Sequence, residues 1–466
     1  MEMVQERKIP VITPITNFFK NFHKRFKEGS LGTKLSHFIM GAGNFYHKQY
    51  IKGAIYLLLQ VGFILFMILE PKVNETPLGF SALGNLITLG SVRGEWPFEI
   101  VDLSVLMLLF GVVTIGIIFV YIFAWNSAIK SSYKVDLDIK EGKKPTTFIE
   151  DVKSLLDDRF HVLMLTPTCL AALVFTILPT LFMILIAFTN FDKNHQMYTH
   201  VFDWTGFENF ANVFQGKGEV ANRFLPVLGW TIVWAIIATF TNYFGGILLA
   251  LLINKKEVKF KKLWRTVFIL TIALPQFISL LAVSKILSPE GPFNGMLIKL
   301  GLIEEGIELL GNAKNVTTAR AMVLIVNLWV GIPYTMLQTS GILMNIPTDL
   351  YEAATIDGAN KNQMFWSITL PYIIFVTTPY LISSFVGNIN SFNIIFLLTG
   401  GGPSLGDGST AGGTDLLVTW LYKLTVEKGD YNLGAVIGIF TFIITSTVTL
   451  VTYRRSKAYN EEDTFQ

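Results

Sequence analysis

Long apolar runs separated by short polar segments dominate the pattern of this 466-residue chain. The hydrocarbon core of a bilayer needs about 20 apolar residues per helix, and eight runs of suitable length contain no Asp, Glu, Lys, Arg or His. These runs cover approximately 53–69, 103–125, 162–188, 227–253, 266–284, 321–345, 372–398 and 433–453. The pattern predicts an all-α polytopic membrane protein with eight transmembrane helices.

The basic residues between these runs predict the orientation of the chain. Short cytoplasmic loops hold an excess of Lys and Arg. The termini and the loops on their side hold 26 of these residues and the opposite loops hold 10, with Lys285 at the edge of a span. We therefore expect both termini in the cytoplasm. The first 50 residues lack the apolar core and the small-residue cleavage site of a signal peptide.

The amino-acid composition excludes several classes of protein. Hydrophobic residues make up 51% of the chain and charged residues only 15%, where about 25% is usual in soluble proteins. The net charge of +3 is too small for a protein that binds nucleic acid. The single cysteine, Cys169, lies in an apolar run, so an internal disulfide is impossible and a thiolate metal cluster is not expected. These numbers exclude soluble and nucleic-acid-binding proteins.

Three segments outside the spans have distinctive patterns. Aromatic and basic residues alternate over 17–27, which suits an interfacial helix on anionic lipid, with a disordered basic tail as the alternative. The stretch 149–160 indicates a short helix with an acidic start, and a solvated linker is the alternative. The external stretch 400–413 is rich in glycine and predicts a flexible loop.

The charge-free spans bear on the source of energy. Coupling to protons or sodium usually needs an ionisable group inside the membrane, and the predicted spans contain none. The chain also lacks the glycine-rich phosphate loop of ATPases. We expect no catalytic residue, metal ligand or bound cofactor, so an active transporter of this kind would need a separate ATPase subunit that binds ATP and Mg²⁺. A membrane-embedded glycosyl or lipid transferase, and a passive channel or scaffold, are the alternatives from other classes.

The predicted cytoplasmic loop between the sixth and seventh spans is acidic, against the usual trend. It contains Asp349, Glu352 and Asp357 but one basic residue, Lys361. Residues 348–358 also read as a short helix, which Thr348 or Asp349 can cap and Gly358 can end. An acidic helix of this kind suits a basic protein partner, and a simple helical turn between two spans is the alternative.

Seven positions in this region carry a resemblance to a known family. They fit the pattern E-A-A-x3-G-x9-I-x-L-P without a gap and are Glu352, Ala353, Ala354, Gly358, Ile368, Leu370 and Pro371. The chain thereby resembles the permease subunits of bacterial ABC importers, the binding-protein-dependent transport system inner-membrane component family. The resemblance implies that 349–358 is the coupling helix that docks on the ATPase, with Asp349, Glu352, Ala353, Ala354, Asp357 and Gly358 at the contact.

A longer resemblance points to the MalF-type permease subunit of maltose/maltodextrin importers. It is similar over about 160–453 and includes the stretches 327–334, 346–354, 398–403 and 414–418. It implies a cytoplasmic N-terminal segment (1–52), two extra spans (53–125), a linker (126–161), a six-helix type I importer core (162–453) and a cytoplasmic tail (454–466). The external loop at 189–226 is shorter than in relatives from Gram-negative bacteria, which suggests a Gram-positive cell.

In that family the large subunit binds sugar halfway across the membrane. The matching residues of the sixth span are Asn327, Gly331 and Tyr334, which share one helical face at i, i+4 and i+7, with Val330 beside them. Gln276, which follows Pro275 in the fifth span, is a further candidate that faces the pore.

The seventh span carries a second polar stripe. Ser384, Asn388 and Ser391 share one face, with Gly387 adjacent. Amides and hydroxyls exchange hydrogen bonds with sugar hydroxyls, and an aromatic ring can cover the apolar face of a pyranose. The alternative is that these amides and hydroxyls bond neighbouring helices and the glycines permit close packing. Asn390 and Asn393 fall off the stripe, and we expect them to bond between helices.

The expected function is therefore that of a permease subunit which carries maltose or maltodextrin by alternating access. Its expected partners are a second permease, two ATPase subunits, an extracellular sugar-binding protein, the oligosaccharide and membrane lipid, but no nucleic acid. Another oligosaccharide or a glycoside is the alternative substrate.

Overall fold

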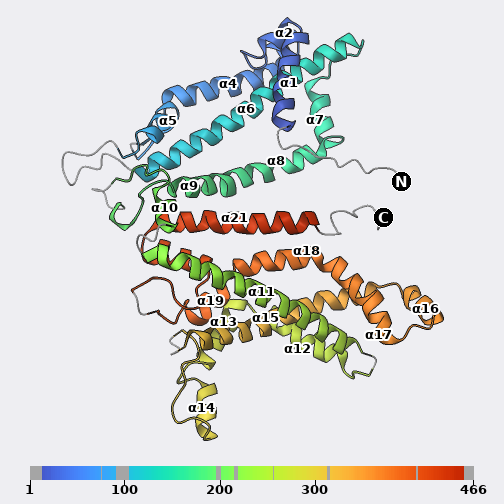
Figure 1. Cartoon of the computed structure of the whole chain (residues 1–466). Coiled ribbons are helices and arrows are strands. Elements are labelled where there is room, and N and C mark those ends of the chain that lie inside the picture. The colour runs from blue at the N-terminus through green and yellow to red at the C-terminus, as the bar shows by residue number, and fades with distance from the viewer. Residues whose placement is uncertain are drawn as a thin grey trace. The chain divides into compact units, whose positions relative to one another are not determined.

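The computed structural model describes residues 13–74, 76–90, 104–195, 201–214, 219–255, 257–311, 315–405 and 408–455. Nearly all of its regular structure is helical (Figure 1), and its two strands, β1 (Lys72–Val73) and β2 (Thr76–Pro77), form one antiparallel pair. The chain divides into two compact units. The first contains 1–185 and 194–204, and the second contains 186–193 and 205–466.

The described residues contain the predicted spans. Seven helices are long and apolar enough to cross a membrane, and the number is eight when one bent helix pair is counted as one span. Most predicted ranges agree with the helices within a few residues, which confirms the all-α polytopic fold. The second span differs, because its helix continues to Lys140, beyond the apolar run that ends near 125.

The helices of the first unit include three membrane spans. They are α1 (Thr13–Glu28), α2 (Leu31–Leu35), α3 (Ala42–Tyr46), α4 (Tyr50–Leu69), α5 (Phe80–Ile87), α6 (Ser104–Lys140), α7 (Phe148–Leu156), α8 (Phe160–Ala172) and α9 (Leu178–Ile186). A π-helical turn, Leu173–Ile177, joins α8 to α9, so that these two helices form one span.

The helices of the second unit include the other five spans. They are α10 (Glu208–Phe214), α11 (Glu219–Asn254), α12 (Lys261–Ala273), α13 (Gln276–Ile286), α14 (Pro292–Lys299), α15 (Val316–Asn345), α16 (Thr348–Ile356), α17 (Lys361–Met364), α18 (Leu370–Ile389), α19 (Phe392–Thr399), α20 (Leu417–Tyr422) and α21 (Tyr431–Arg455). The turns Phe365–Thr369 and Lys423–Glu427 are π-helical, and Lys193–His195 is a 3₁₀ turn.

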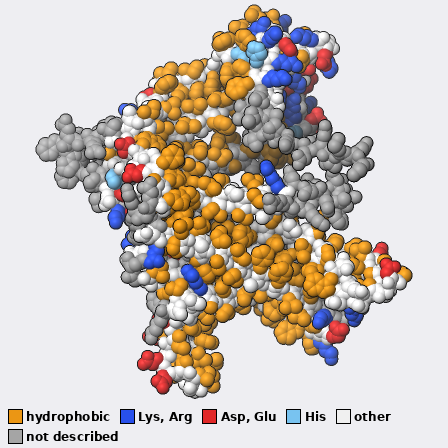
Figure 2. Space-filling view, viewed as in Figure 1, with side chains coloured by type: hydrophobic (Ala, Val, Ile, Leu, Met, Phe, Trp, Pro, Cys, Tyr) orange, Lys and Arg blue, Asp and Glu red, His pale blue; other side chains and the backbone are white. Residues whose placement is uncertain are grey.

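The basic N-terminal segment is an ordered helix in the first unit. The ring of Phe22 in α1 lies 4.8 Å from that of His37 and 5.3 Å from that of Trp125. Arg25 donates a 2.9 Å hydrogen bond to Asn126 in α6. The alternative of a disordered tail is therefore wrong for Thr13–Glu28. Figure 2 shows Lys and Arg side chains gathered at the end of this unit that carries α1, α2 and α7.

A buried carboxylate joins the short helices to α6. The side chain of Asp136 is 2% exposed and accepts hydrogen bonds from the backbone N–H of Ser30 (2.8 Å) and the hydroxyl of Thr33 (2.6 Å). Nε2 of His47 lies 2.7 Å from its other oxygen. Thr33 also exchanges a hydrogen bond with Ser132. Because both carboxylate oxygens are used, this residue fixes α2 and α3 on α6.

Asp136→Asn is expected to loosen these short helices. The amide lacks the negative charge of the carboxylate, so the hydrogen bonds of Ser30, Thr33 and His47 to this position would become weaker neutral ones, at a cost of about 1 kcal/mol. Hydrogen exchange measured over 30–47 should become faster, while exchange in α15 of the second unit serves as the control. Unchanged exchange in both places would contradict this role for Asp136.

The second amphipathic segment also forms a helix. Thr147 and Glu150 make a reciprocal capping box at the start of α7, with Glu150 accepting from the backbone N–H of Thr147 at 2.7 Å. This hydrogen bond lowers the pKa of Glu150. The helix ends at Leu156, and the solvated-linker alternative is wrong for Phe148–Leu156.

Helix α11 is the central packing element of the second unit. It lies along α15 and also packs on α18 (Figure 1). Gly246 permits the close approach to α15, because a Cβ there would lie 2.4 Å from Thr335. Trp230 and Trp234 of α11 belong to a buried apolar cluster with Leu280 of α13 and Val323 of α15. This cluster forms the core beside which the cavity described below lies.

The fifth span is broken, although the sequence predicted a continuous helix over 266–284. Helix α12 ends at Ala273, α13 begins at Gln276, and the two differ in direction by 94°. Pro275 has no backbone N–H and disfavours the helical conformation at the preceding residue. Leu274 is extended, with φ −79° and ψ 137°. The proline therefore turns this span sharply at 274–275.

The acidic loop forms a short helix, as the sequence predicted, but its start is different. Pro347 precedes α16 and no side chain caps its first turn, so the expected caps Thr348 and Asp349 are wrong. Both residues lie inside the helix, because Pro347 already occupies the capping position. The predicted end is confirmed: Gly358 has φ +79°, a left-handed conformation that favours glycine.

The glycine-rich stretch 400–413 and the residues beside it are tightly bonded in their described part, which omits 406 and 407. The hydroxyls of Thr399 and Thr414 lie 2.8 Å apart, and Thr414 donates to the carbonyl of Gly402 at 2.6 Å. Asp415, whose side chain is fully buried, lies 2.7 Å from Nζ of Lys423. Within the loop, Ser404 and Gly412 form an antiparallel bridge, and the backbone N–H of Gly413 donates to the carbonyl of Pro403 at 2.8 Å. The described part of 400–413 is therefore hydrogen-bonded, and its flexibility stays a prediction. Composition identified the turns but missed the buried ion pair that holds them.

Candidate functional site

A cavity of about 730 Å³ lies among six helices of the second unit, α11, α12, α13, α15, α18 and α19. All nine residues that the sequence proposed for a transport site line it: Gln276, Asn327, Val330, Gly331, Tyr334, Ser384, Gly387, Asn388 and Ser391. The other lining residues are Asn242, Thr271, Ile272, Ala273, Leu274, Pro275, Tyr380, Ser383 and Ile394. The structure therefore brings the two predicted stripes together around one space.

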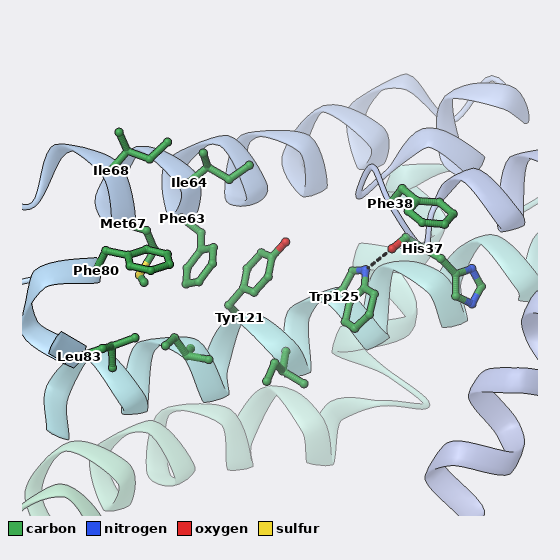
Figure 3. Close-up of a pocket in the computed structure, with 12 residues that line it drawn as sticks. His37, Phe38, Phe63, Ile64, Met67, Ile68, Phe80, Leu83, Tyr121 and Trp125 are labelled. Carbon is green, nitrogen blue, oxygen red and sulfur yellow. Dashed lines mark hydrogen bonds between the residues drawn. The ribbon is translucent and has the colours of Figure 1, made fainter. Parts of the chain in front are cut away.

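A second cavity, in the first unit, is very different. Its volume is about 600 Å³, and mainly aliphatic and aromatic side chains of α4, α5 and α6 line it (Figure 3). The ring of Tyr121 stacks on Phe63 with centroids 3.8 Å apart, and the indole of Trp125 donates to the carbonyl of His37. This space lacks the set of amides and hydroxyls found in the second unit, so it is not the candidate site for a polar ligand.

The stripe on α15 forms one wall of the candidate site. Asn327 is 2% exposed, and its amide nitrogen has no hydrogen-bond partner among the described residues. Tyr334 is 47% exposed, and its ring lies 5.8 Å from that of Tyr380 on α18, tilted by 35°. The hydroxyl of Tyr380 is 3.1 Å from that of Thr335. The wall therefore combines a buried amide with a pair of aromatic rings.

The stripe on α18 forms the opposite wall. The amide nitrogen of Asn388 donates to the hydroxyl of Thr239 at 2.9 Å, and its backbone carbonyl accepts from the indole of Trp234 at 3.2 Å. A Cβ added to Gly387 would meet nothing within 4 Å, so this position leaves open space. Asn388 therefore bonds to α11, as the packing alternative predicted, and also lines the cavity.

The seventh span also breaks, just beyond this stripe. Helix α18 ends at Ile389 and α19 starts at Phe392, so Ser391 lies at the start of α19 and not on the same helix as Ser384. The helical spacing argument fails for Ser391, although the residue still lines the cavity. Asn390 donates to the carbonyl of Val386 in its own helix at 3.2 Å, so the expected bond to another helix is wrong there.

The broken fifth span supplies the floor of the cavity. Residues 271–276, which include the break, line it with a mixture of side chains and backbone. The side chain of Gln276 accepts from Asn393 of α19 at 3.4 Å, which confirms a bond between helices for Asn393. Discontinuous spans of this kind expose backbone groups only where they line a cavity.

Sequence reasoning missed four polar residues of the site. Asn242 comes from α11, Thr271 from α12, and Tyr380 and Ser383 from α18. Tyr380 lies one helical turn before Ser384, so the period of the stripe contained a signal for it. Asn242 had no such signal, because α11 was not known to face the same space.

The site is polar but uncharged. The residues that line it in the described part of the chain include no Asp, Glu, Lys, Arg or His. Four amides, four Ser and Thr hydroxyls and two phenols line it instead. Such groups donate and accept hydrogen bonds without a charge, which suits a neutral, hydroxyl-rich ligand.

Helix α16 lies apart from this cavity and is open to contact. It is at the far end of α15 and α17 (Figure 1), and none of its residues is buried. Asp349, Glu352 and Ala353 are exposed, and Ile356 is 86% exposed. The helix therefore presents an acidic surface and one large apolar side chain.

Comparisons with known proteins agree with these features. Residues 242–457 match the family described as "Binding-protein-dependent transport system inner membrane component". The galactooligosaccharide permease GanP of Bacillus subtilis is 33% identical over 425 residues, which are 91% of this chain and 97% of GanP. The maltodextrin permease MalC of Streptococcus pneumoniae serotype 4 is 33% identical over 434 residues, or 91% of this chain and 95% of MalC.

A solved structure shares the fold. A bacterial ABC transporter involved in the import of the acidic polysaccharide alginate aligns with 66% of this chain and 97% of its own, with 24% identity and a TM-score of 0.51. The relatives are transport components, so the chain is not an enzyme, and the transferase alternative is excluded. ATP hydrolysis in this family takes place in a separate subunit. The chain belongs to the family of binding-protein-dependent transport system inner membrane components, the permease subunits of ABC importers.

Proposed function

We propose that this subunit imports a neutral oligosaccharide, with maltose and maltodextrins as the main substrates. The observation that carries this proposal is the uncharged cavity, whose amides, hydroxyls and two tyrosines suit sugar hydroxyls and pyranose faces. MalC of S. pneumoniae is named for maltodextrin and GanP of B. subtilis for galactooligosaccharides. A galactooligosaccharide or a glycoside is therefore the alternative substrate.

Each wall of the cavity has a role in this proposal. The amides of Asn327 and Asn388, with Ser384, Ser391 and Gln276, exchange hydrogen bonds with the sugar. Tyr334 covers the apolar face of a pyranose ring, since its ring is half exposed to the cavity. Val330, Gly331 and Gly387 shape the space between these groups.

The proposed assembly is a heterodimer with a second permease, two ATPase subunits that bind ATP and Mg²⁺, and an extracellular binding protein. Both termini face the cytoplasm, and the core of the importer is 162–453, preceded by the two extra spans. Closure of the ATPase subunits moves α16, which carries Glu352, Ala353, Ala354 and Asp357, and so switches access to the cavity. The short external loops suit a Gram-positive cell.

Uptake into proteoliposomes that contain the whole importer tests the substrate. Maltotriose, a galactooligosaccharide of the same length and an alginate trisaccharide should each be offered with binding protein and ATP. We expect maltotriose to be imported and the alginate trisaccharide to be rejected, because no cation of the lining pairs with its carboxylates. Import of the galactooligosaccharide alone would select the alternative, and import of alginate would refute the proposal.

Gly331→Val should block transport while the importer still assembles. A Cβ at this position would lie 2.2 Å from the amide nitrogen of Asn242 and would displace that side chain from the cavity wall. The displaced amide would close part of the sugar site, so uptake at limiting sugar should fall by roughly 5- to 150-fold, the equivalent of about 1–3 kcal/mol of lost binding. Gly387→Val is the matched comparison, since it adds the same atoms where space is open.

Purification of the two variant complexes, followed by uptake assays, checks this expectation. Gly331→Val should yield a complex of normal composition with lowered uptake, and Gly387→Val should lower uptake less. Normal uptake by Gly331→Val would show that the sugar passes elsewhere.

A further inference from the structure

Two unpaired polar atoms lie in the wall of the cavity. The amide oxygen of Asn242 and the amide nitrogen of Asn327 are both buried and have no hydrogen-bond partner among the described residues. Asn242 is 8% exposed and Asn327 is 2% exposed. Buried amide atoms are almost always hydrogen-bonded, so an unpaired one calls for an explanation. Here two occur on neighbouring helices that face one cavity.

Gly331 explains why these amides lie close together. It follows Asn327 by four residues and therefore lies on the same face of α15. The whole amide group of Asn242 occupies the space where a side chain at 331 would begin, with Nδ2, Cγ and Oδ1 at 2.2, 2.5 and 2.8 Å from an added Cβ. Asn242 thus reaches across from α11 into a notch on α15, one helical turn from Asn327.

The unpaired atoms complement each other. One accepts a hydrogen bond and the other donates one, and a hydroxyl group can do both at once. Both atoms are shielded from the open cavity, so each amide must turn about its terminal torsion to present an oxygen or a nitrogen to a hydroxyl. Because the lining holds no charged side chain, a hydroxyl suits these atoms better than a carboxylate or an ammonium group.

We propose that Asn242 is a specificity-determining residue of the transport site, and that its amide and that of Asn327 bind hydroxyl groups of one sugar ring at the notch over Gly331. This inference rests on the proposed function of the cavity as the sugar site. It adds α11 to the helices that contact the sugar and determine specificity. Helical periodicity alone offers no reason to place α11 there, because the stripes lie on α15 and α18.

Asn242→Leu is the informative variant. Leucine has a similar size and removes a buried unpaired acceptor, so a residue that makes no contact with the sugar predicts unchanged or higher thermal stability and normal transport. The binding role predicts that thermal stability is kept but uptake of maltotriose at limiting concentration falls about tenfold, the usual effect of losing one or two hydrogen bonds. Asn390→Leu is the matched control, because Asn390 bonds within its own helix and does not line the cavity.

The assay is uptake into proteoliposomes by the complete importer with its binding protein. Wild type, Asn242→Leu, Asn327→Leu and Asn390→Leu are compared with maltotriose and with a set of analogues that each lack one hydroxyl. For the analogue that lacks the hydroxyl bound by Asn242, wild type and Asn242→Leu should show equally low uptake. The variant has already lost the side chain that binds this hydroxyl, so removal of the hydroxyl has no further effect. The control should behave as wild type with every sugar.

The outcomes separate the two proposals. If wild type imports no neutral oligosaccharide, the proposed function fails and this inference falls with it. If wild type imports maltotriose and Asn327→Leu impairs uptake, but Asn242→Leu transports every analogue as wild type does, the inference about Asn242 alone is wrong. A uniform loss for all sugars, with lowered thermal stability of Asn242→Leu, would assign the residue a structural role and also overturn the inference.

Discussion

Glu352→Lys is expected to abolish ATP-driven transport with no change in the cavity. In the proposed docking, the exposed carboxylate of Glu352 on α16 meets a basic residue of the ATPase subunit. Loss of one partner from a desolvated charge pair costs about 2–5 kcal/mol, and a reversed charge adds repulsion. A cost of about 2 kcal/mol already weakens the contact about 30-fold, so the ATPase should be lost or uncoupled.

Affinity purification of tagged chain from its own membrane, followed by an ATPase assay, measures this effect. Wild type should retain stoichiometric ATPase whose activity rises with maltodextrin and binding protein, and Glu352→Lys should not. Glu305→Lys is the matched control, because it makes the same charge change at an exposed position between α14 and α15. Equal retention and stimulation in all three samples would remove α16 from the coupling contact.

Lys423→Met is expected to destabilise the second unit more than any other change considered. Its ammonium group lies 2.7 Å from Asp415, whose side chain is fully buried and whose Oδ1 has no partner among the described residues. Removal of one partner from a buried ion pair costs about 3–5 kcal/mol, because the other charge stays buried alone. The thermal midpoint of the purified complex should fall clearly, and Lys423→Met combined with Asp415→Asn should recover part of the loss.

The loss should also depend on pH. Burial raises the pKa of Asp415 above its ordinary value, and Lys423 opposes that rise. A carboxyl whose pKa is raised in the folded state favours folding while it is protonated, and this contribution is lost as the pH rises through the folded-state pKa. The variant should therefore be more strongly destabilised near neutral pH than in acid, as thermal midpoints at several pH values would show. A pH-independent difference from wild type would contradict an uncompensated carboxylate.

The membrane spans and the polar stripes could be predicted from sequence because each depends on one segment at a time. An apolar run of sufficient length specifies a span, and helical periodicity places Asn327, Gly331 and Tyr334 on one face. Periodicity does not say which other helix faces the stripe. Asn242 was missed for this reason, since its position in the cavity wall follows from the packing of α11 on α15.

Breaks in the spans were the second source of error. No charged residue occurs at 274–275 or 390–391, so both breaks lie inside charge-free runs. Pro275 was a usable signal for the first break. The break after Ile389 has no proline, and Asn390 and Ser391 give only a weak sign of it. The ion pair of Asp415 and Lys423 could not be predicted from the sequence for another reason. Burial of a charged side chain depends on the whole surrounding loop.

The absence of charged side chains from the described lining of the cavity also has an electrical consequence. Moving one elementary charge across the membrane changes the free energy by about 2.3 kcal/mol per 100 mV of membrane potential. A neutral sugar held only by amides, hydroxyls and phenols such as those of Asn388, Ser384 and Tyr334 moves no charge through that field. The sugar step is then indifferent to voltage, so a cell whose membrane potential has collapsed could still accumulate sugar for as long as it has ATP.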